Sequence, residues 1–297
     1  MCEIFALSAS EEIEINPWLK TFFSHANQHP HGWGLANLDQ DTPIIEKEPI
    51  NALKSSYLAS RLKAPYQTSC ALAHIRYATI GNMDYLNCHP FTKKDRYGRN
   101  WTLVHNGTIF DFSLMNRYLD QQAGQTDSER ILYYIVGRIN QASQIKKSPL
   151  TSSERFRVIN HVLMHMAQKN KLNILLYDQE NLYVHTNFKN SLYMTSLEHG
   201  RLFSTKPLSE TEWEPVPFMQ VLAYHQGQLL YEGMPHPFEY LEDKKSHGNV
   251  VFGVCEFVDG GIYGRSFRKT NCVYSGNRQR KIYPENDAIN GWKKTGK

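Results

Sequence analysis

The order of the predicted elements is the feature of this sequence that most constrains its fold. Alternating apolar positions predict strands over residues 1–7, 69–79 and 101–107. Helical spacing follows over 126–139 and 153–168, and strands return between 172 and 231. Strands, then helices, then strands again indicate an α+β layered domain rather than a doubly wound parallel sheet. Neither a Gly-x-Gly-x-x-Gly motif nor a Walker motif occurs in the sequence.

Three shorter helices are also predicted from local signals. Asn16 is of a residue type that caps helices, and Pro17 suits the first helical position after it. Apolar residues at helical spacing predict an amphipathic helix over 51–62, and another helix is predicted from about Phe112. In the longer helix that follows, Thr126 and Glu129 form a capping box.

The strand over 101–107 ends in a polar tip, Asn106-Gly107. The Asn106 amide and the unshielded backbone N–H of Gly107 are the two kinds of donor that hold an oxyanion. Asn-Gly is also the commonest two-residue hairpin turn, so the pair alone leaves both interpretations open.

Residue 2, a cysteine, is a candidate nucleophile that could act together with the two donors at residues 106 and 107. A small residue at this position allows removal of Met1, which would leave Cys2 as the N-terminal residue. Its α-amine, with a reference pKa of about 7.7–8.0, could then take the proton of the Cys2 thiol and create a nucleophile. The alternative is a small buried thiol at the start of a strand.

Two charged residues interrupt otherwise structural patterns. Arg76 breaks the apolar run of the strand over 69–79, and a buried arginine needs a partner: a bound carboxylate or an internal ion pair. Asp127 stands in the first turn of a predicted helix, where the helix dipole alone explains an acidic residue. The pair His29 and His31 lacks a third metal ligand at a sensible spacing, so a turn is favoured and no metal site is predicted.

Composition limits the class of protein. The chain has 297 residues, of which 41% are hydrophobic, enough for a large core. No stretch of about 20 apolar residues predicts a membrane span, and no signal peptide is recognised. Five cysteines, without a Cys-x-x-Cys pair, argue against disulfides and zinc, so we expect a cytoplasmic protein.

The C-terminal end differs from the rest of the chain. Residues 244–297 carry a net charge of +7, against +4 for the whole chain. Without an aromatic-basic pattern, the basic residues argue for a solvated face and against nucleic-acid binding. A polar stretch over 243–249 reads as a linker, and a strand-like apolar run follows over 249–258. We therefore expect a domain over 1–240 and a basic extension over 241–297, packed on that domain or on a partner.

Motifs in the right order resemble one family, the class II glutamine amidotransferases, which are N-terminal-nucleophile hydrolases. The resemblance covers about residues 1 to 235 and is most similar to stand-alone amidotransferase domains. The residues that carry it are Met1-Cys2-Glu3-Ile4, Gly32-Trp33-Gly34, Ala73-His74-Ile75-Arg76-x-Ala78, Asn87-x-His89-Pro90-Phe91, Trp101 through Gly107, and Thr126-Asp127-Ser128-Glu129.

The resemblance implies a four-layer αββα sandwich and a role for each matched residue. Cys2 would attack the carboxamide of glutamine or of a γ-glutamyl amide and form a thioester, while Asn106 and Gly107 hold the oxyanion. Arg76 would bind the substrate α-carboxylate and Asp127 its α-ammonium, and Thr79 would help to close the pocket. The resemblance implies no cofactor.

Two departures from the family pattern keep other functions open. His31 stands where relatives usually have an acidic residue, and Ile80 replaces a histidine common in synthase-linked members. These departures leave open a non-catalytic ligand-binding or scaffold protein. A glutaminase subunit that feeds ammonia to a separate synthase is a further alternative, and Ile80 argues against ammonia transfer. A homo-oligomer also stays open.

Overall fold

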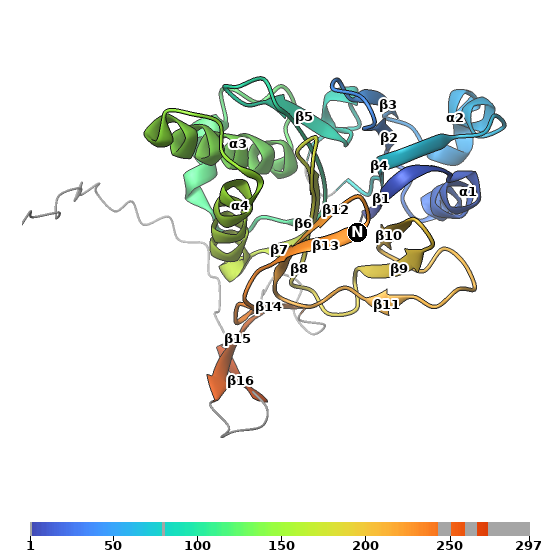
Figure 1. Ribbon diagram of the computed structural model, residues 1–297. Coiled ribbons are helices and arrows are strands. Elements are labelled where there is room, and N and C mark those ends of the chain that lie inside the picture. Colours follow the sequence, from blue (N-terminus) through green and yellow to red (C-terminus); the bar gives the residue numbers. More distant parts are fainter. Residues whose placement is uncertain (1, 79–80, 243–250, 259–265, 273–297) are drawn as a thin grey trace, which may run out of the picture.

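The computed structural model describes residues 2–78, 81–242, 251–258 and 266–272, the last two ranges by their main chain alone. Two large antiparallel sheets dominate it (Figure 1). The first has the strand order β11-β9-β10-β1-β4-β2-β3 and the second β13-β12-β8-β7-β6-β5. The strands of the first sheet are β1 (Glu3–Glu14), β2 (Trp33–Asn37), β3 (Ile44–Glu48), β4 (Gln67–Ile75), β9 (Tyr193–Leu197), β10 (Gly200–Ser204) and β11 (Glu214–Pro215). Those of the second are β5 (Phe91–Lys94), β6 (Asn100–Thr108), β7 (Lys171–Tyr177), β8 (Leu182–Thr186), β12 (Val221–His225) and β13 (Gln228–Glu232).

Helices cover the outer face of each sheet. The α-helices are α1 (Asn16–Ser24), α2 (Ser56–Arg61), α3 (Asp127–Lys146) and α4 (Ser152–Met166). Short 3-10 helices are η1 (His25–Asn27), η2 (Ala52–Lys54), η3 (Tyr85–Asn87), η4 (Ser113–Tyr118) and η5 (Ala167–Lys169). In Figure 1, α1 and α2 lie on the side of β1 and β4, and α3 and α4 lie on the opposite side, beyond β6 and β7. The predicted four-layer αββα sandwich is therefore confirmed.

Strand alternation decides which residues meet between the two sheets. The even-numbered residues Ile4, Ala6 and Leu72 of the first sheet and Val104 of the second share one buried apolar cluster between the sheets. Their odd-numbered neighbours pack outward against the helices. The inner faces of β1, β4 and β6 are thus fixed by period-two patterning.

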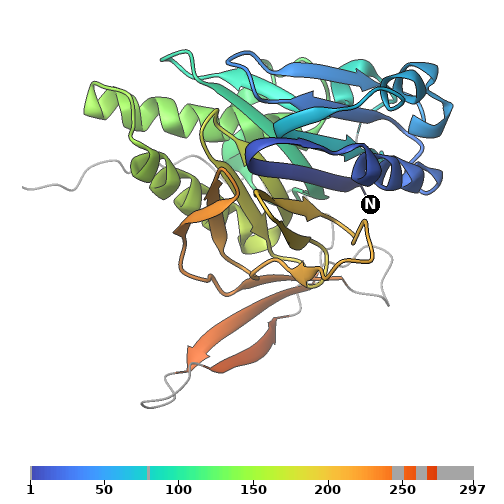
Figure 2. The same cartoon turned by 45° about the vertical axis from the view of Figure 1, so that its right-hand side comes forward.

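A third, smaller sheet has the order β14-β15-β16, with β14 (Phe238–Leu241), β15 (Val251–Val258) and β16 (Ser266–Cys272). The predicted strand over 249–258 is confirmed as β15. In Figures 1 and 2 the hairpin of β15 and β16 projects from the body, and β14 links it to the second sheet. The predicted linker over 243–249 lies outside the described residues.

Three local predictions are wrong. Ile15, not Asn16, precedes helix α1, and the Asn16 side chain instead binds Leu62 O and Ala64 O. The predicted helix over 51–62 is split into η2 and α2, because the Ser55 side chain accepts the Leu58 N–H and caps a new helix there. The helix expected from Phe112 is the 3-10 helix η4.

Candidate functional site

Cys2 lies directly before β1, at one end of the space between the sheets. Continuing the alternation of Ile4 and Ala6 places it on the inner face of the first sheet. Its Sγ donates to the main-chain oxygen of Tyr77 (3.5 Å) and accepts the Tyr77 N–H (3.3 Å). The side chain is half-buried. The pKa of the Cys2 thiol is raised, chiefly by burial, and the Tyr77 amide opposes this rise.

Asn106 and Gly107 lie inside strand β6, so the hairpin-turn alternative is wrong. Asn106 follows Val104 on the inner face of the second sheet, and its side chain is buried. A Cβ on Gly107 would lie 1.9 Å from Lys171 O of the neighbouring strand. Only glycine therefore allows β6 and β7 to approach this closely.

Strand pairing decides where the Gly107 N–H points. Gly107 stands opposite Leu172 of β7, but the N–H and C=O of Leu172 both bind Asn187 on the other side. The two residues thus form a non-hydrogen-bonded pair, and the Gly107 N–H turns away from β7. On that side β5 pairs with β6 only as far as Leu103. Within the described part of the chain, the Gly107 N–H therefore faces an open edge.

Arg76 and Asp127 contribute opposite charges to the surroundings of Cys2. Arg76 follows β4, is buried, and donates to the main-chain oxygens of Asn82 (2.9 Å) and Gly81 (3.2 Å). Asp127 begins α3, and its Oδ2 accepts the Ile109 N–H (2.9 Å). The charge of Arg76 lowers the pKa of the Cys2 thiol and that of Asp127 raises it, both less than burial does. Both side chains are thus within electrostatic range of the thiol. Thr79 and Ile80 lie outside the described residues.

The N-terminus of α3 is anchored to β6 by a histidine. His105 Nδ1 lies 3.0 Å from the hydroxyl of Ser128, which follows Asp127, and its Nε2 lies 3.3 Å from Lys171 O. The Thr126 side chain accepts the Glu129 N–H, as expected of the helix cap. The Glu129 carboxylate, however, binds Ala123 N–H and Gly124 N–H rather than completing the capping box.

A buried carboxylate next to Cys2 was not predicted. Glu3 lies on the outer face of β1 and contacts His25 (2.7 Å), His29 (3.0 Å) and Lys206 (2.6 Å). Burial alone would raise the pKa of Glu3, but these three partners hold it well below its usual value. The only signal in the sequence was an acidic residue inside an apolar strand.

The turn that carries His31 supports the loop after β4. His31 Nδ1 accepts the Ala78 N–H (2.9 Å), and the main chains of His31 and Gly32 both bind that of Arg76. His29 and His31 thus have different hydrogen-bond partners, Glu3 and the Ala78 N–H. Among the residues that the structure describes, no group of three or more His, Cys, Asp or Glu is arranged to hold a metal.

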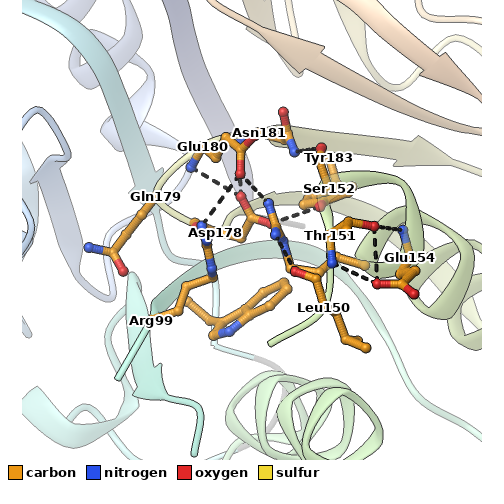
Figure 3. Close-up of polar contacts among 12 residues, drawn as sticks. Arg99, Leu150, Thr151, Ser152, Glu154, Asp178, Gln179, Glu180, Asn181 and Tyr183 are labelled. Carbon is orange, nitrogen blue, oxygen red and sulfur yellow. Dashed lines mark hydrogen bonds and ion pairs between the residues drawn. The ribbon is translucent and has the colours of Figure 1, made fainter. Parts of the chain in front are cut away.

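A surface cavity of about 440 Å³ lies at the opposite end of β6 and β7, and its lining includes Arg99, Arg155 and Gln179. Figure 3 shows the polar network beside it. Arg155 binds Asp178 (2.6 Å) and Leu150 O (2.9 Å), and Tyr183 donates to the same carboxylate. These charges bind the turns to one another, and none of the predicted site residues that the structure describes lines this cavity.

Comparison with known proteins agrees with the motifs. The family described as class II glutamine amidotransferases matches residues 1–200. An uncharacterised protein of Methanocaldococcus jannaschii, MJ1515, is 24% identical over 260 residues, which cover 78% of this chain and 71% of that protein. YafJ of Escherichia coli (strain K12), whose name carries an unconfirmed glutamine amidotransferase assignment, is 27% identical over 181 residues, covering 60% and 70%.

Solved structures share the fold. A protein of Pseudomonas aeruginosa PA01, described as a predicted glutamine amidotransferase, superposes with a TM-score of 0.56 at 19% identity, over 77% of this chain and 100% of that one. The glutamine phosphoribosylpyrophosphate amidotransferase of Bacillus subtilis gives 0.55 at 17% identity, over 77% and 48%. No helix in the described ranges is long and apolar enough to cross a membrane. With its family match spanning most of its length, this chain belongs to the class II glutamine amidotransferases.

Proposed function

We propose that this protein hydrolyses the γ-carboxamide of glutamine, or a γ-glutamyl amide, through a thioester on Cys2. The observation that carries the proposal is the arrangement at one end of the sandwich. A cysteine precedes β1 on the inner face of one sheet, while the facing strand β6 carries, near its C-terminal end, Asn106 and a Gly107 N–H that turns toward an open edge. A nucleophile and two oxyanion donors are the minimum needed for acyl transfer.

Removal of Met1 supplies the base. The raised pKa of the Cys2 thiol means that few thiolates exist without help, and the freed α-amine of Cys2 can take the proton. The thiolate then forms a C–S bond to the amide carbon, and the carbonyl oxygen becomes an oxyanion held by Asn106 and Gly107. Collapse breaks the C–N bond, and the α-ammonium returns its proton to the leaving ammonia or amine. The same amine then deprotonates water, whose oxygen forms a C–O bond to the thioester carbon. The C–S bond breaks, the α-ammonium returns the proton to the Cys2 sulfur, and glutamate is released.

Opposite charges select the amino-acid end of the substrate. The Arg76 guanidinium is the group for the α-carboxylate, because its planar fork can bind both oxygens. Asp127 is the group for the α-ammonium. Its Oδ2 already accepts the Ile109 N–H, and its Oδ1 lies 3.4 Å from the Ser128 hydroxyl, so Oδ1 is the freer oxygen for a substrate.

Intact-mass measurement after treatment with a glutamine-analogue diazo ketone tests this proposal. We expect a protein without Met1 that gains one adduct, mapped to Cys2, and we expect Cys2→Ala to gain none. Cys88→Ala is the matched control, since this buried thiol lies on another segment and should leave labelling unchanged. Active protein that retains Met1, or an adduct on another residue, would contradict the mechanism.

A second candidate is a glutaminase that passes ammonia to a separate synthase. Its support is the resemblance to glutamine--fructose-6-phosphate aminotransferase of Chlamydia muridarum, 29% identical over 121 residues, which cover only 19% of that enzyme. Comparing glutamine with γ-glutamyl alkylamides separates the two. Faster turnover of the alkylamides favours a γ-glutamyl amidohydrolase, and turnover of glutamine alone favours the ammonia donor. We expect the reaction to take place in the cytoplasm.

A further inference from the structure

A buried residue, Asn187, joins strand β14 to the second sheet by main-chain and side-chain hydrogen bonds. The N–H of Tyr240 in β14 donates to the main-chain oxygen of Asn187 (2.7 Å), and the Asn187 Nδ2 donates to Phe238 O (3.3 Å). The same Nδ2 also lies 2.8 Å from Asn170 O. Asn187 is fully buried, so these hydrogen bonds have no water to replace them.

On its other side Asn187 holds the strand that faces the proposed oxyanion donor. Its Oδ1 accepts the Leu172 N–H (2.8 Å) and its own N–H donates to Leu172 O (3.2 Å). Leu172 stands opposite Gly107, and a Cβ on Gly107 would lie 1.9 Å from Lys171 O. Because the strands are in such close contact, the position of β7 at residues 171–172 sets the position of Gly107.

A second contact runs from β14 to the segment after Gly107. The ring of Tyr240 stacks on that of Phe110, with centroids 6.0 Å apart and planes 4° from parallel. The Phe110 N–H donates to Asn170 Oδ1 (2.6 Å), and the preceding Ile109 N–H donates to Asp127. Tyr240 is buried, although it stands at the start of the C-terminal sheet.

We propose that Asn187 and Tyr240 are positioning residues for the Gly107 oxyanion donor, and that β14 is the element through which the C-terminal sheet fixes the catalytic strand. The inference rests on the proposed function for its kinetic consequence. A donor aimed at a developing oxyanion is sensitive to small displacements, since a misplacement of about 1 Å can cost about a hundredfold in rate. Loss of the β14 contacts with Asn187, which binds Leu172, and with Phe110 would allow such a displacement without touching Cys2.

The variant Tyr240→Ala tests the proposal, with Tyr240→Phe as the matched control that keeps the ring. We expect Tyr240→Ala to lower kcat for glutamine about 10- to 100-fold relative to Tyr240→Phe, with KM changed less than about threefold. Binding of glutamate γ-semialdehyde, whose thiohemiacetal places an oxygen in the same site, should weaken by the same factor. The rate of Cys2 alkylation by iodoacetamide should stay unchanged, whereas a general loss of structure would change it.

Hydrogen exchange tests the same coupling without any reaction. The amides of Ile109, Phe110 and Leu172 should exchange at least about tenfold faster in Tyr240→Ala than in Tyr240→Phe. Equal exchange together with kcat within about twofold would overturn the inference. If the wild-type protein hydrolyses neither glutamine nor γ-glutamyl amides, the proposed function fails, and exchange alone then decides whether β14 positions this strand. Asn187→Ala, which removes the side-chain bonds to Leu172 and Phe238, should show a larger effect in both assays.

Discussion

Acid should destabilise this fold through a histidine buried between the sheets. His74 on β4 is fully buried and stacks on His89, with ring centroids 3.9 Å apart and planes 24° from parallel. Neither ring nitrogen of His74 has a hydrogen-bond partner among the described residues. Burial, followed by the positive charge of Arg76, lowers the pKa of His74 to about 3. A protonated imidazole is therefore strongly disfavoured in the folded state.

The size of the effect follows from the two pKa values. In the unfolded chain the ordinary pKa of 6.5 applies, so between that value and about 3 the unfolded state binds the extra proton. The stability contributed by neutral His74 is thus complete above the unfolded pKa and is lost as pH falls. One pKa unit corresponds to about 1.4 kcal/mol, so the free energy of unfolding should fall by about 2 kcal/mol between pH ~7.5 and pH ~5. The loss would reach about 4 kcal/mol near pH ~3.

Urea unfolding of His74→Gln and of the wild type, near pH 7.5 and near pH 5, measures this contribution. Any fixed cost of the substitution cancels, because the quantity compared is the change in unfolding free energy between the two pH values. We expect that change to be about 2 kcal/mol smaller in His74→Gln. His161→Gln, which alters an exposed histidine on α4, should behave as the wild type. Equal pH sensitivity of His74→Gln and the wild type would refute the assignment of a low pKa.

Three further predictions concern the site itself. Gly107→Ala should destabilise the protein by about 1–3 kcal/mol and lower kcat, because the new Cβ would overlap Lys171 O. Thermal unfolding and kinetics measure the two effects, and unchanged stability would contradict the overlap. Arg76→Lys should raise KM for glutamine more than it lowers kcat, an expectation that equal activity on substrates lacking the α-carboxylate would contradict. Cys2→Ala should abolish hydrolysis but still bind glutamine, as calorimetry can measure.

The sequence pattern predicted strands correctly where buried and exposed positions, or the two buried faces, alternate with a regular period. The strands on which Ile4 and Val104 lie show the expected alternation, and Thr126 caps α3 as its residue type suggested. The prediction failed at Asn16, a residue type suited to a cap. Its side chain binds Leu62 O and Ala64 O and accepts the Tyr66 N–H, so contacts made across about fifty residues of sequence outweighed a local preference.

The site was predictable in its residue types but not in its geometry. Asn106 and Gly107 offer a side-chain amide and a main-chain N–H whether the sequence is interpreted as an oxyanion site or as a hairpin turn. The Gly107 N–H points away from β7 because the N–H and C=O of Leu172 both bind Asn187. The edge that it faces is open because β5 pairs with β6 only as far as Leu103. Neither the Leu172–Asn187 hydrogen bonds nor the end of the β5–β6 pairing can be predicted from the sequence around residue 107. A donor's direction depends on the pairing of its whole sheet, which single-sequence patterns do not contain.

The buried Glu3 shows the same dependence from the opposite side of the first sheet. A carboxylate next to a catalytic thiol would oppose thiolate formation if it faced the same way, since like charges disfavour each other. Strand alternation instead turns Glu3 to the outer face, where His25, His29 and Lys206 surround it. Glu3 can thereby anchor the start of β1, while Arg76 and Asp127, the two groups proposed to bind the substrate, are the charged side chains that act on the Cys2 thiol. Because adjacent residues of a strand face opposite sides of the sheet, Glu3 can anchor the strand without placing its charge beside the Cys2 thiol.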